Sequence, residues 1–217
     1  MAITMFVIRT PYVPFVHGPR SGRWGKLIII DGPEVNDPPT LGTGYDSKMS
    51  IPVPDDRENR CLWLNQNTDL ILDQRKFTTI ERTGGYVMLR PNCPHDPPYK
   101  HPKDGPYTVK VENGNSVVRN LYRSGRPPTY DGPVYHDGKC LRIKGAVTTK
   151  EQGILFHEAP HVGWLTGCIS PRTYGTTDIS LNTDLNKKFW RNESHKAMEE
   201  IFKLIGGQTA NLWVLDY

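Results

Sequence analysis

The sequence predicts a mainly β protein with long loops rich in proline and glycine and one helix near the C-terminus. Its 217 residues include 19 prolines and 20 glycines, which favour turns over long helices. Several segments alternate apolar and polar residues with the period of a strand, and the clearest helical spacing lies near the C-terminus. Hydrophobic residues make up 36%, so the chain is not of the disordered class. A chain of this length buries roughly 70% of its unfolded surface and needs no disulfide staples.

The strands are expected where apolar runs end in turns. Residues 25–33, "GKLIIIDGP", form an apolar run of strand length that stops at Asp-Gly-Pro. Residues 107–112 alternate, as in a strand with one buried face. Two short strands are expected around Asp137-Gly138, which is a favoured two-residue hairpin turn. We therefore expect antiparallel β-structure from Gly105 to Gly145.

The helix is expected in the segment before the last strand. Either Asn192 or Ser194 can cap its start, and Gly206-Gly207 can end it. Its apolar face would carry Ala197, Met198, Ile201, Phe202 and Ile205. The alternation in "NLWVLDY" then predicts a final strand. Its two faces would carry Leu212, Val214 and Asp216 on one side and Trp213, Leu215 and Tyr217 on the other.

The domain organisation follows from the proline-rich stretches. Residues 90–106 contain six prolines, which remove backbone donors and predict a long loop. Residues 1–104 are expected to form an N-terminal β and loop region packed on a core of residues 105–217. The two together should make one compact unit.

Charge and hydropathy narrow the class of partner. The net charge of +4 is mild and its lysines and arginines are spread along the chain, which disfavours nucleic acid. A modest positive field would suit an anionic polymer or a carboxylate-bearing peptide. The first residues lack the pattern of a signal peptide, and no run approaches the ~20 apolar residues of a membrane span. We expect synthesis in the cytoplasm and no membrane span.

Two other clusters are weaker candidates for function. The four cysteines are far apart and form no CxxC pair, so the disulfide state of Cys61, Cys93 and Cys140 stays open. Cys93 lies near His95, Asp96 and His101, but the spacing matches no standard zinc pattern, so no metal or cofactor is expected. Around Tyr122, three arginines are best explained as a solvated charged face: Arg119, Arg123 and Arg126.

The stretch "HEAPHVGWLTGCISPR" carries the strongest candidate site. A cysteine attacks carbonyls as a thiolate, so it needs a nearby proton acceptor such as histidine. His157 closes the apolar run "GILFH" and would be held by a strand, from which the following loop can return Cys168 to its side. The competing interpretation is that Cys168 is a small buried hydrophobe and His157 a hydrogen-bonded core histidine.

The neighbours of the cysteine suggest further roles. Gly167 leaves room for substrate, and the amides of Gly167 and Cys168 could donate to an oxyanion. A third group should orient the imidazole, and Glu158, the backbone carbonyl after the histidine and His161 are all candidates. Thr166 could line the site or hydrogen-bond the base.

This stretch resembles the signature of L,D-transpeptidase-like proteins, and the resemblance covers roughly Gly105 to Tyr217. The matching positions are His157, Thr166, Gly167, Cys168 and Ile169. It is most similar to type VI secretion effectors that edit peptidoglycan by L,D-carboxypeptidase and exchange activity, and to a phage-associated group. The chain has Thr166 where the classical enzymes have a second histidine, and Ser170 where they have an arginine.

The resemblance implies both a fold and an activity. The fold would be a sandwich- or barrel-like core of the L,D-transpeptidase type. Cys168 would form a thioester with a peptidoglycan stem peptide, with His157 as its base and Arg172 as a substitute ligand for the substrate carboxylate. Water would complete a carboxypeptidase cycle, and an amine would complete exchange.

The same resemblance implies partners and a location. The protein would be delivered to the periplasm of a target cell by a secretion-machine carrier, with an immunity protein as a further partner. Two other functions stay open at this point. One is a non-catalytic phage, secretion-apparatus or cell-wall-binding module, and the other is a thiol protease.

Overall fold

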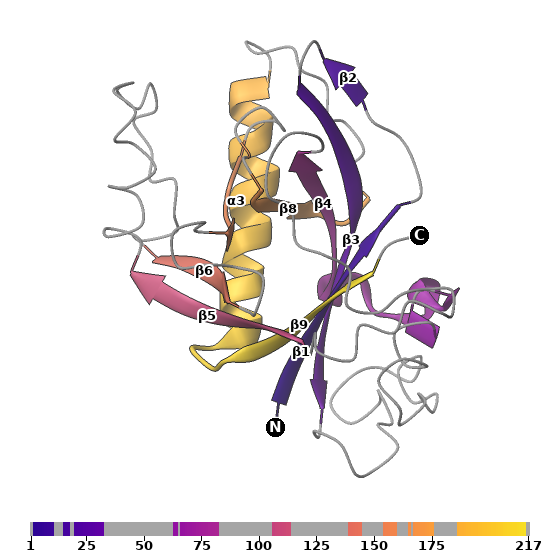
Figure 1. Ribbon diagram of the computed structural model, residues 1–217, viewed down its shortest axis with the longest axis vertical. Coiled ribbons are helices and arrows are strands. Elements are labelled where there is room, and N and C mark those ends of the chain that lie inside the picture. The colour runs from indigo at the N-terminus through magenta and orange to yellow at the C-terminus, as the bar shows by residue number, and fades with distance from the viewer. Residues whose placement is uncertain are drawn as a thin grey trace.

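The computed structural model describes eleven stretches of the chain, and every structural statement below refers to them. They are residues 2–10, 15–17, 20–32, 63–64, 66–82, 106–113, 139–144, 154–159, 165, 167–175 and 186–215. Strands dominate them, together with one long helix and two single 3-10 turns (Figure 1). The prediction of a mainly β protein with a C-terminal helix is confirmed.

Nine strands form one sheet that closes on itself. Their order is β1-β9-β5-β6-β7-β8-β4-β3-β2, and an additional pairing of β1 with β3 closes the first eight into a barrel. Only β1–β9 and β7–β8 pair in parallel among the pairings of the described strands. The strands are β1 (Ala2–Arg9), β2 (Phe15–His17), β3 (Arg20–Gly32), β4 (Lys76–Arg82), β5 (Tyr107–Asn113), β6 (Lys139–Lys144), β7 (Leu155–Phe156), β8 (Ile169–Thr173) and β9 (Ala210–Leu215).

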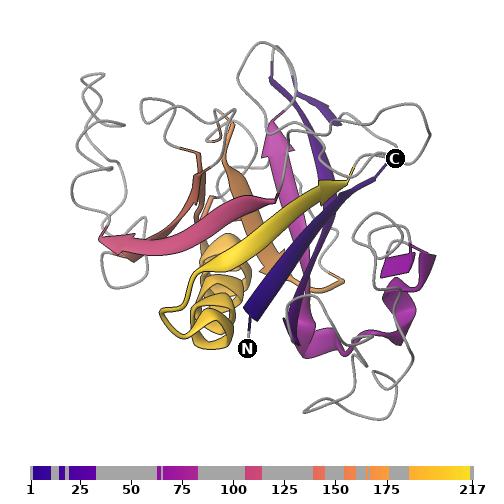
Figure 2. The same cartoon turned by 60° about the horizontal axis from the view of Figure 1, so that its bottom comes forward.

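The two parts of the chain contribute neighbouring strands to this ring. β1, β3 and β4 precede residue 105, and β9 and β8, which follow it, pair with β1 and β4 respectively. The strands curve around the helix α3 (Asn186–Ile205), which lies against β8 (Figures 1 and 2). The barrel therefore needs strands from both parts.

The hydrophobic core has two clusters on opposite faces of the strands. The larger one joins alternate residues of most strands to the buried stripe of α3, which consists of Ala197, Met198, Ile201 and Ile205. The smaller one joins β1, β3 and β9 to the short segment around the turns η2 (Thr68–Leu70) and η3 (Asp73–Arg75). Leu212 and Val214 of β9 lie in the larger cluster, and Trp213 and Leu215 lie in the smaller one. The two predicted faces of the last strand are confirmed.

The strands predicted within residues 25–33 and 107–112 are also present. β3 extends the first to 13 residues, and β5 buries Tyr107 and Val109 while exposing Lys110. β6 pairs antiparallel with β5, as expected for residues 105–145. The other strand of the expected hairpin, its Asp137-Gly138 turn and the loop of residues 90–105 lie outside the described residues.

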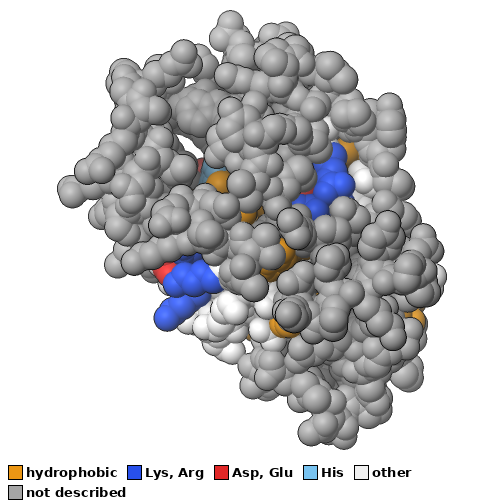
Figure 3. All heavy atoms as spheres, viewed as in Figure 1, with side chains coloured by type: hydrophobic (Ala, Val, Ile, Leu, Met, Phe, Trp, Pro, Cys, Tyr) orange, Lys and Arg blue, Asp and Glu red, His pale blue; other side chains and the backbone are white. Residues whose placement is uncertain are grey.

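Opposite charges connect β5 and β6 on their exposed side. Glu112 accepts from Lys144, and the Nη1 atom of Arg142 lies 3.4 Å from its Oε2 atom. Figure 3 shows basic and acidic side chains together over these strands. Partial burial raises the pKa of Glu112, but the hydrogen bonds and charges of Lys144 and Arg142 outweigh it and hold that pKa below its ordinary value. The charged side chains thus form the solvent-facing side of the pair β5 and β6.

The start of α3 differs from the prediction. The helix begins at Asn186, so Asn192 and Ser194 lie inside it and do not cap its start. The Ser194 hydroxyl donates to the Pro171 carbonyl of β8 over 2.9 Å, which is a contact between elements. The predicted end is confirmed, because Gly206 (φ 58°) and Gly207 (φ 83°) adopt the left-handed conformation that ends helices. None of the helices in the described part of the chain is both long enough and apolar enough to cross a membrane.

A buried ion pair joins β1 to β4 across β3. Arg9 binds Glu81 with two hydrogen bonds, of 2.7 Å from Nε and 3.1 Å from Nη2, and both residues are buried. Arg23 of β3 approaches the same carboxylate at 3.8 Å. Gly25 lets β3 approach β1 closely, because a Cβ atom there would lie 2.6 Å from the Ile8 carbonyl oxygen. No sequence pattern that we considered predicted the pair.

Candidate active site

His157 directly follows the short strand β7. Its backbone N–H donates to the Ile169 carbonyl over 3.1 Å, which extends the parallel pairing of β7 with β8 by one residue. The residue is 7% exposed. The predicted strand before the histidine is therefore present, and it fixes the backbone of His157 beside the strand that follows Cys168.

The imidazole of His157 is oriented by its own chain segment. Nδ1 lies 2.7 Å from the backbone carbonyl oxygen of Glu158. A carbonyl oxygen can only accept, so Nδ1 carries the proton and Nε2 carries the lone pair of the neutral ring. Of the three orienting groups that the sequence left open, it is the backbone carbonyl that hydrogen-bonds to the imidazole ring.

Burial sets the protonation state of this histidine. Desolvation of the imidazolium lowers the pKa of His157 below its ordinary value of 6.5, although the hydrogen bond to the Glu158 carbonyl acts in the opposite direction. The ring is therefore neutral at pH 7. A neutral imidazole is the form that can accept a proton.

Cys168 lies immediately before β8 and is buried, at 4% exposure. The preceding Gly167 has a φ of 135°, a conformation that side-chain-bearing residues rarely adopt. The chain thus turns sharply into the strand at the cysteine. This is a positional requirement for glycine that the sequence motif alone did not reveal.

Strand register relates the two residues. Phe156 pairs with Ile169 across β7 and β8, and both belong to the larger core cluster. His157 follows Phe156 and Cys168 precedes Ile169, so the two lie on neighbouring segments, displaced in opposite directions from the paired residues. The structure therefore places the predicted base and nucleophile at the end of β7 and at the start of β8, two strands that pair with each other.

The segment after His157 is held by two further side chains. The Glu158 carboxylate lies 2.8 Å from Nδ1 of His195 on α3, and the Glu158 side chain is buried. Nη2 of Arg172, on β8, donates to the Ala159 carbonyl over 3.4 Å. Glu158 and Arg172 were predicted as an orienting and a substrate-binding residue. Glu158 lies in the segment that carries the base, and Arg172 contacts that segment.

Several predicted residues lie outside the described part of the chain. These are Thr166 and His161 of the site, the loop residues Cys93, His95, Asp96 and His101, and the cluster Arg119, Tyr122, Arg123 and Arg126. The pairing of Cys61 and of the Cys140 side chain lies outside it too. Within the described residues, no group of three or more histidine, cysteine, aspartate or glutamate side chains could hold a metal ion.

Sequence reasoning missed the contribution of α3 to the site. His195 binds Glu158, and Ser194 bonds both to the Pro171 carbonyl and to Ser170, whose Oγ atom lies 3.2 Å from its own. These residues were considered only as parts of a helix that packs on the sheet. A histidine and a serine on an otherwise apolar helical face were the available signal.

The chain was compared with protein-family models, with curated proteins and with solved structures, and none of them matched.

Proposed function

We propose that the protein is a cysteine enzyme that acts on peptidoglycan stem peptides by forming a thioester, as an L,D-carboxypeptidase, an L,D-transpeptidase or both. The observation that carries the chemistry is the placement of His157 directly after β7 and of Cys168 directly before its parallel partner β8, with Nδ1 of His157 bonded to the Glu158 carbonyl. The substrate class rests on the motif from His157 to Ile169. A barrel core of the L,D-transpeptidase type is part of the same proposal.

The proposed first half-reaction begins with proton transfer. Nε2 of His157 takes the proton of the Cys168 thiol, and the thiolate sulfur attacks the carbonyl carbon of a stem-peptide bond. Backbone amides at Gly167 and Cys168 are the proposed donors to the oxyanion. Collapse breaks the C–N bond, the leaving amine takes the proton from His157, and a thioester remains on Cys168.

The second half-reaction reverses these roles. His157 accepts a proton from water or from an incoming amine, which attacks the thioester carbonyl. The C–S bond breaks and the Cys168 thiolate recovers the proton from His157. Water yields a shortened stem, and an amine yields an exchanged or cross-linked stem. Arg172 is proposed to assist with the substrate carboxylate.

A first experiment tests the activity. Purified protein and its Cys168→Ala variant are incubated with bacterial peptidoglycan, and released stem peptides are analysed by mass spectrometry. Loss of a terminal D-alanine, or its replacement by another D-amino acid, is expected only with Cys168 intact. Identical products from both proteins would contradict the proposal.

Delivery to a target cell belongs to the same proposal. A peptidoglycan enzyme acts outside the cytoplasm, so a secretion-machine carrier and an immunity protein are its proposed partners. Expression with an added export signal should slow growth of a bacterial host, whereas expression in the cytoplasm should not. If the exported Cys168→Ala variant is equally harmful, the toxicity does not come from this chemistry.

The burial of both candidate residues favours a second function. Cys168 at 4% and His157 at 7% exposure would also suit packing roles in a non-catalytic phage, secretion-apparatus or cell-wall-binding module. Binding to purified cell wall that is equal in wild type and Cys168→Ala, without change in the stems, would support that module. Cleavage of polypeptides instead of stems would indicate a thiol protease.

A further inference from the structure

Three consecutive residues of α3 contact both chain segments that carry the candidate site. Glu193 accepts from the Thr173 hydroxyl at the end of β8, and Ser194 donates to the Pro171 carbonyl over 2.9 Å. His195 lies 2.8 Å from the carboxylate of Glu158, on the segment after β7. We call Glu193, Ser194 and His195 the helix clamp.

Ser194 gives the clamp a buried anchor. Its side chain is completely buried and its hydroxyl is committed to the Pro171 carbonyl, so the neighbouring Ser170 hydroxyl donates to it over 3.2 Å. Pro171 has no N–H but its carbonyl still needs a partner when buried. The clamp supplies that partner three residues after the proposed nucleophile, and it links α3 to β8.

His195 extends the clamp to the segment that holds the base. The Glu158 side chain is buried, and a buried carboxylate needs a donor or a positive charge. The carbonyl of the same residue accepts from Nδ1 of His157. The Glu158 side chain is bonded to His195 and the Glu158 carbonyl is bonded to His157. Together these contacts restrict the rotation of the peptide between Glu158 and Ala159.

We propose that His195 is a positioning residue, which holds Glu158 so that its carbonyl keeps the His157 imidazole in one orientation, with Nε2 as the proposed acceptor of the Cys168 proton. This inference rests on the proposed function only in the identity of the nucleophile and base, and it makes no use of the substrate. Arg172 supports the same segment through the Ala159 carbonyl. The helix is thus a part of the site that the motif does not contain.

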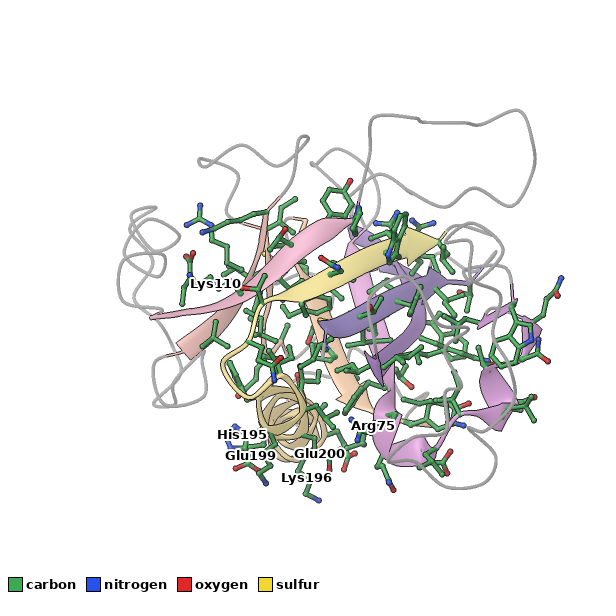
Figure 4. The ribbon with its side chains drawn as sticks, turned by 90° about the horizontal axis from the view of Figure 1, so that it is seen from below. Arg75, Lys110, His195, Lys196, Glu199 and Glu200 are labelled. Atoms are coloured by element: carbon green, nitrogen blue, oxygen red, sulfur yellow. The ribbon has the colours of Figure 1, made fainter. Side chains whose placement is uncertain are left out.

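The geometry of α3 supplies matched variants. Figure 4 shows His195 and Glu199 on one side of the helix, whereas Lys196 projects away from the strands. Lys196 is exposed, so Lys196→Ala removes a neighbouring positive group without touching the segment. His195→Asn places an amide N–H close to the position of Nδ1, so it should rescue the contact that His195→Ala removes.

The experiment measures the reactivity of Cys168 itself. Each variant is treated with iodoacetamide between pH 5 and pH 10, and the alkylated peptide that contains Cys168 is quantified by mass spectrometry, which separates it from the other cysteines. A cysteine whose proton the neutral His157 accepts reacts faster at pH 7 than an ordinary thiol, which titrates near ~8.5. Thermal unfolding of each variant is recorded in parallel.

We expect His195→Ala to lower the alkylation rate at pH 7 by roughly tenfold and to move its inflection toward that of an ordinary thiol. His195→Asn and Lys196→Ala should keep the wild-type profile. Glu158→Gln, which keeps the shape and loses the charge, should give an intermediate profile. It serves as the test if His195→Ala does not fold.

Two results would overturn the inference. One is a wild-type profile in folded His195→Ala or, where that variant does not fold, in folded Glu158→Gln. The other is a wild-type Cys168 that already titrates as an ordinary thiol. Failure of the proposed function would look different, because unchanged peptidoglycan together with the expected alkylation profiles would leave the clamp intact and change only the substrate.

Discussion

Two regions of the same barrel are both buried but differ in the polarity of their buried side chains. β1 and β9 bury apolar side chains on both faces, such as Met5 and Phe6, which belong to the larger and the smaller core cluster. β4 and β8 bury several polar residues beside their apolar ones, among them Thr78, Thr79, Glu81, Ser170 and Arg172. Apolar burial stabilises without fixing direction, whereas each buried polar group needs a particular partner. The first region therefore holds the barrel together, and the second determines where individual atoms lie.

The largest effect on stability is expected in the apolar region. Phe6 is buried in the smaller cluster, and Phe6→Ala should lower the free energy of unfolding by about 4 kcal/mol. Urea denaturation measures this loss. The alkylation rate of Cys168 in the folded fraction should not change, and a clear decrease would show that the two regions are coupled.

A somewhat smaller loss is expected from the ion pair between the regions. Glu81→Ala leaves the buried guanidinium of Arg9 without its carboxylate and should cost about 3 kcal/mol. The double variant Arg9→Met, Glu81→Leu should recover most of this loss, because apolar replacements often equal a buried ion pair in stability. Urea denaturation of wild type, Glu81→Ala and the double variant compares their free energies of unfolding. A double variant less stable than Glu81→Ala would contradict the prediction.

Gly167→Ala should change the reactivity of Cys168 more than the stability of the fold, which is the reverse of Phe6→Ala. An alanine at φ 135° is strained, and relief of that strain would move Cys168, so Gly167→Ala should lose no more than about 2 kcal/mol of stability. Its Cys168 alkylation should nevertheless fall roughly tenfold. Gly207→Ala is the matched control, since that residue has a φ of 83° and open space around its Cβ position. Equal alkylation in the two variants would refute the role of the turn.

The smallest effect is a pH dependence that comes from His157. Its pKa is lower in the folded chain than the ordinary value of 6.5, so the unfolded chain binds more protons between the two values. Stability should therefore rise with pH through that window, reach its full value above about 6.5 and fall on acidification. Comparing wild type with His157→Gln by urea denaturation from pH 5 to pH 8 isolates the contribution of His157 to the pH dependence of stability. Parallel curves would contradict it.

Much of the fold could be predicted where one face of an element is apolar. The alternation in β5 and β9 and the buried stripe of α3 are local patterns, and each was confirmed. The start of α3 was wrong because Ser194 has the chemistry of a helix cap, but its hydroxyl bonds to the Pro171 carbonyl, which a local pattern does not contain. β1 and β4 were not assigned, and their partners β9 and β8 lie far away in sequence.

The candidate site was predictable in its residue types and less so in its arrangement. Spacing and chemistry selected His157, Gly167 and Cys168, and the expected strand before the histidine is present. The sequence left three orienting groups open, because a backbone carbonyl is present at every position and has no signature. The contribution of His195 depends on how α3 packs on the barrel, and no motif encodes that packing.

The parallel pairing of β1 with β9 has a consequence for how the chain folds. Ile3 and Ala210 are neighbours in the barrel although nearly the whole sequence lies between them. Contacts of such separation carry a high loop-closure cost and slow the search for the native state. β1 can pair with β3 before β9 has been synthesised, whereas the barrel can close only afterwards. We therefore expect closure of the barrel by β9 to be the slow step of its folding.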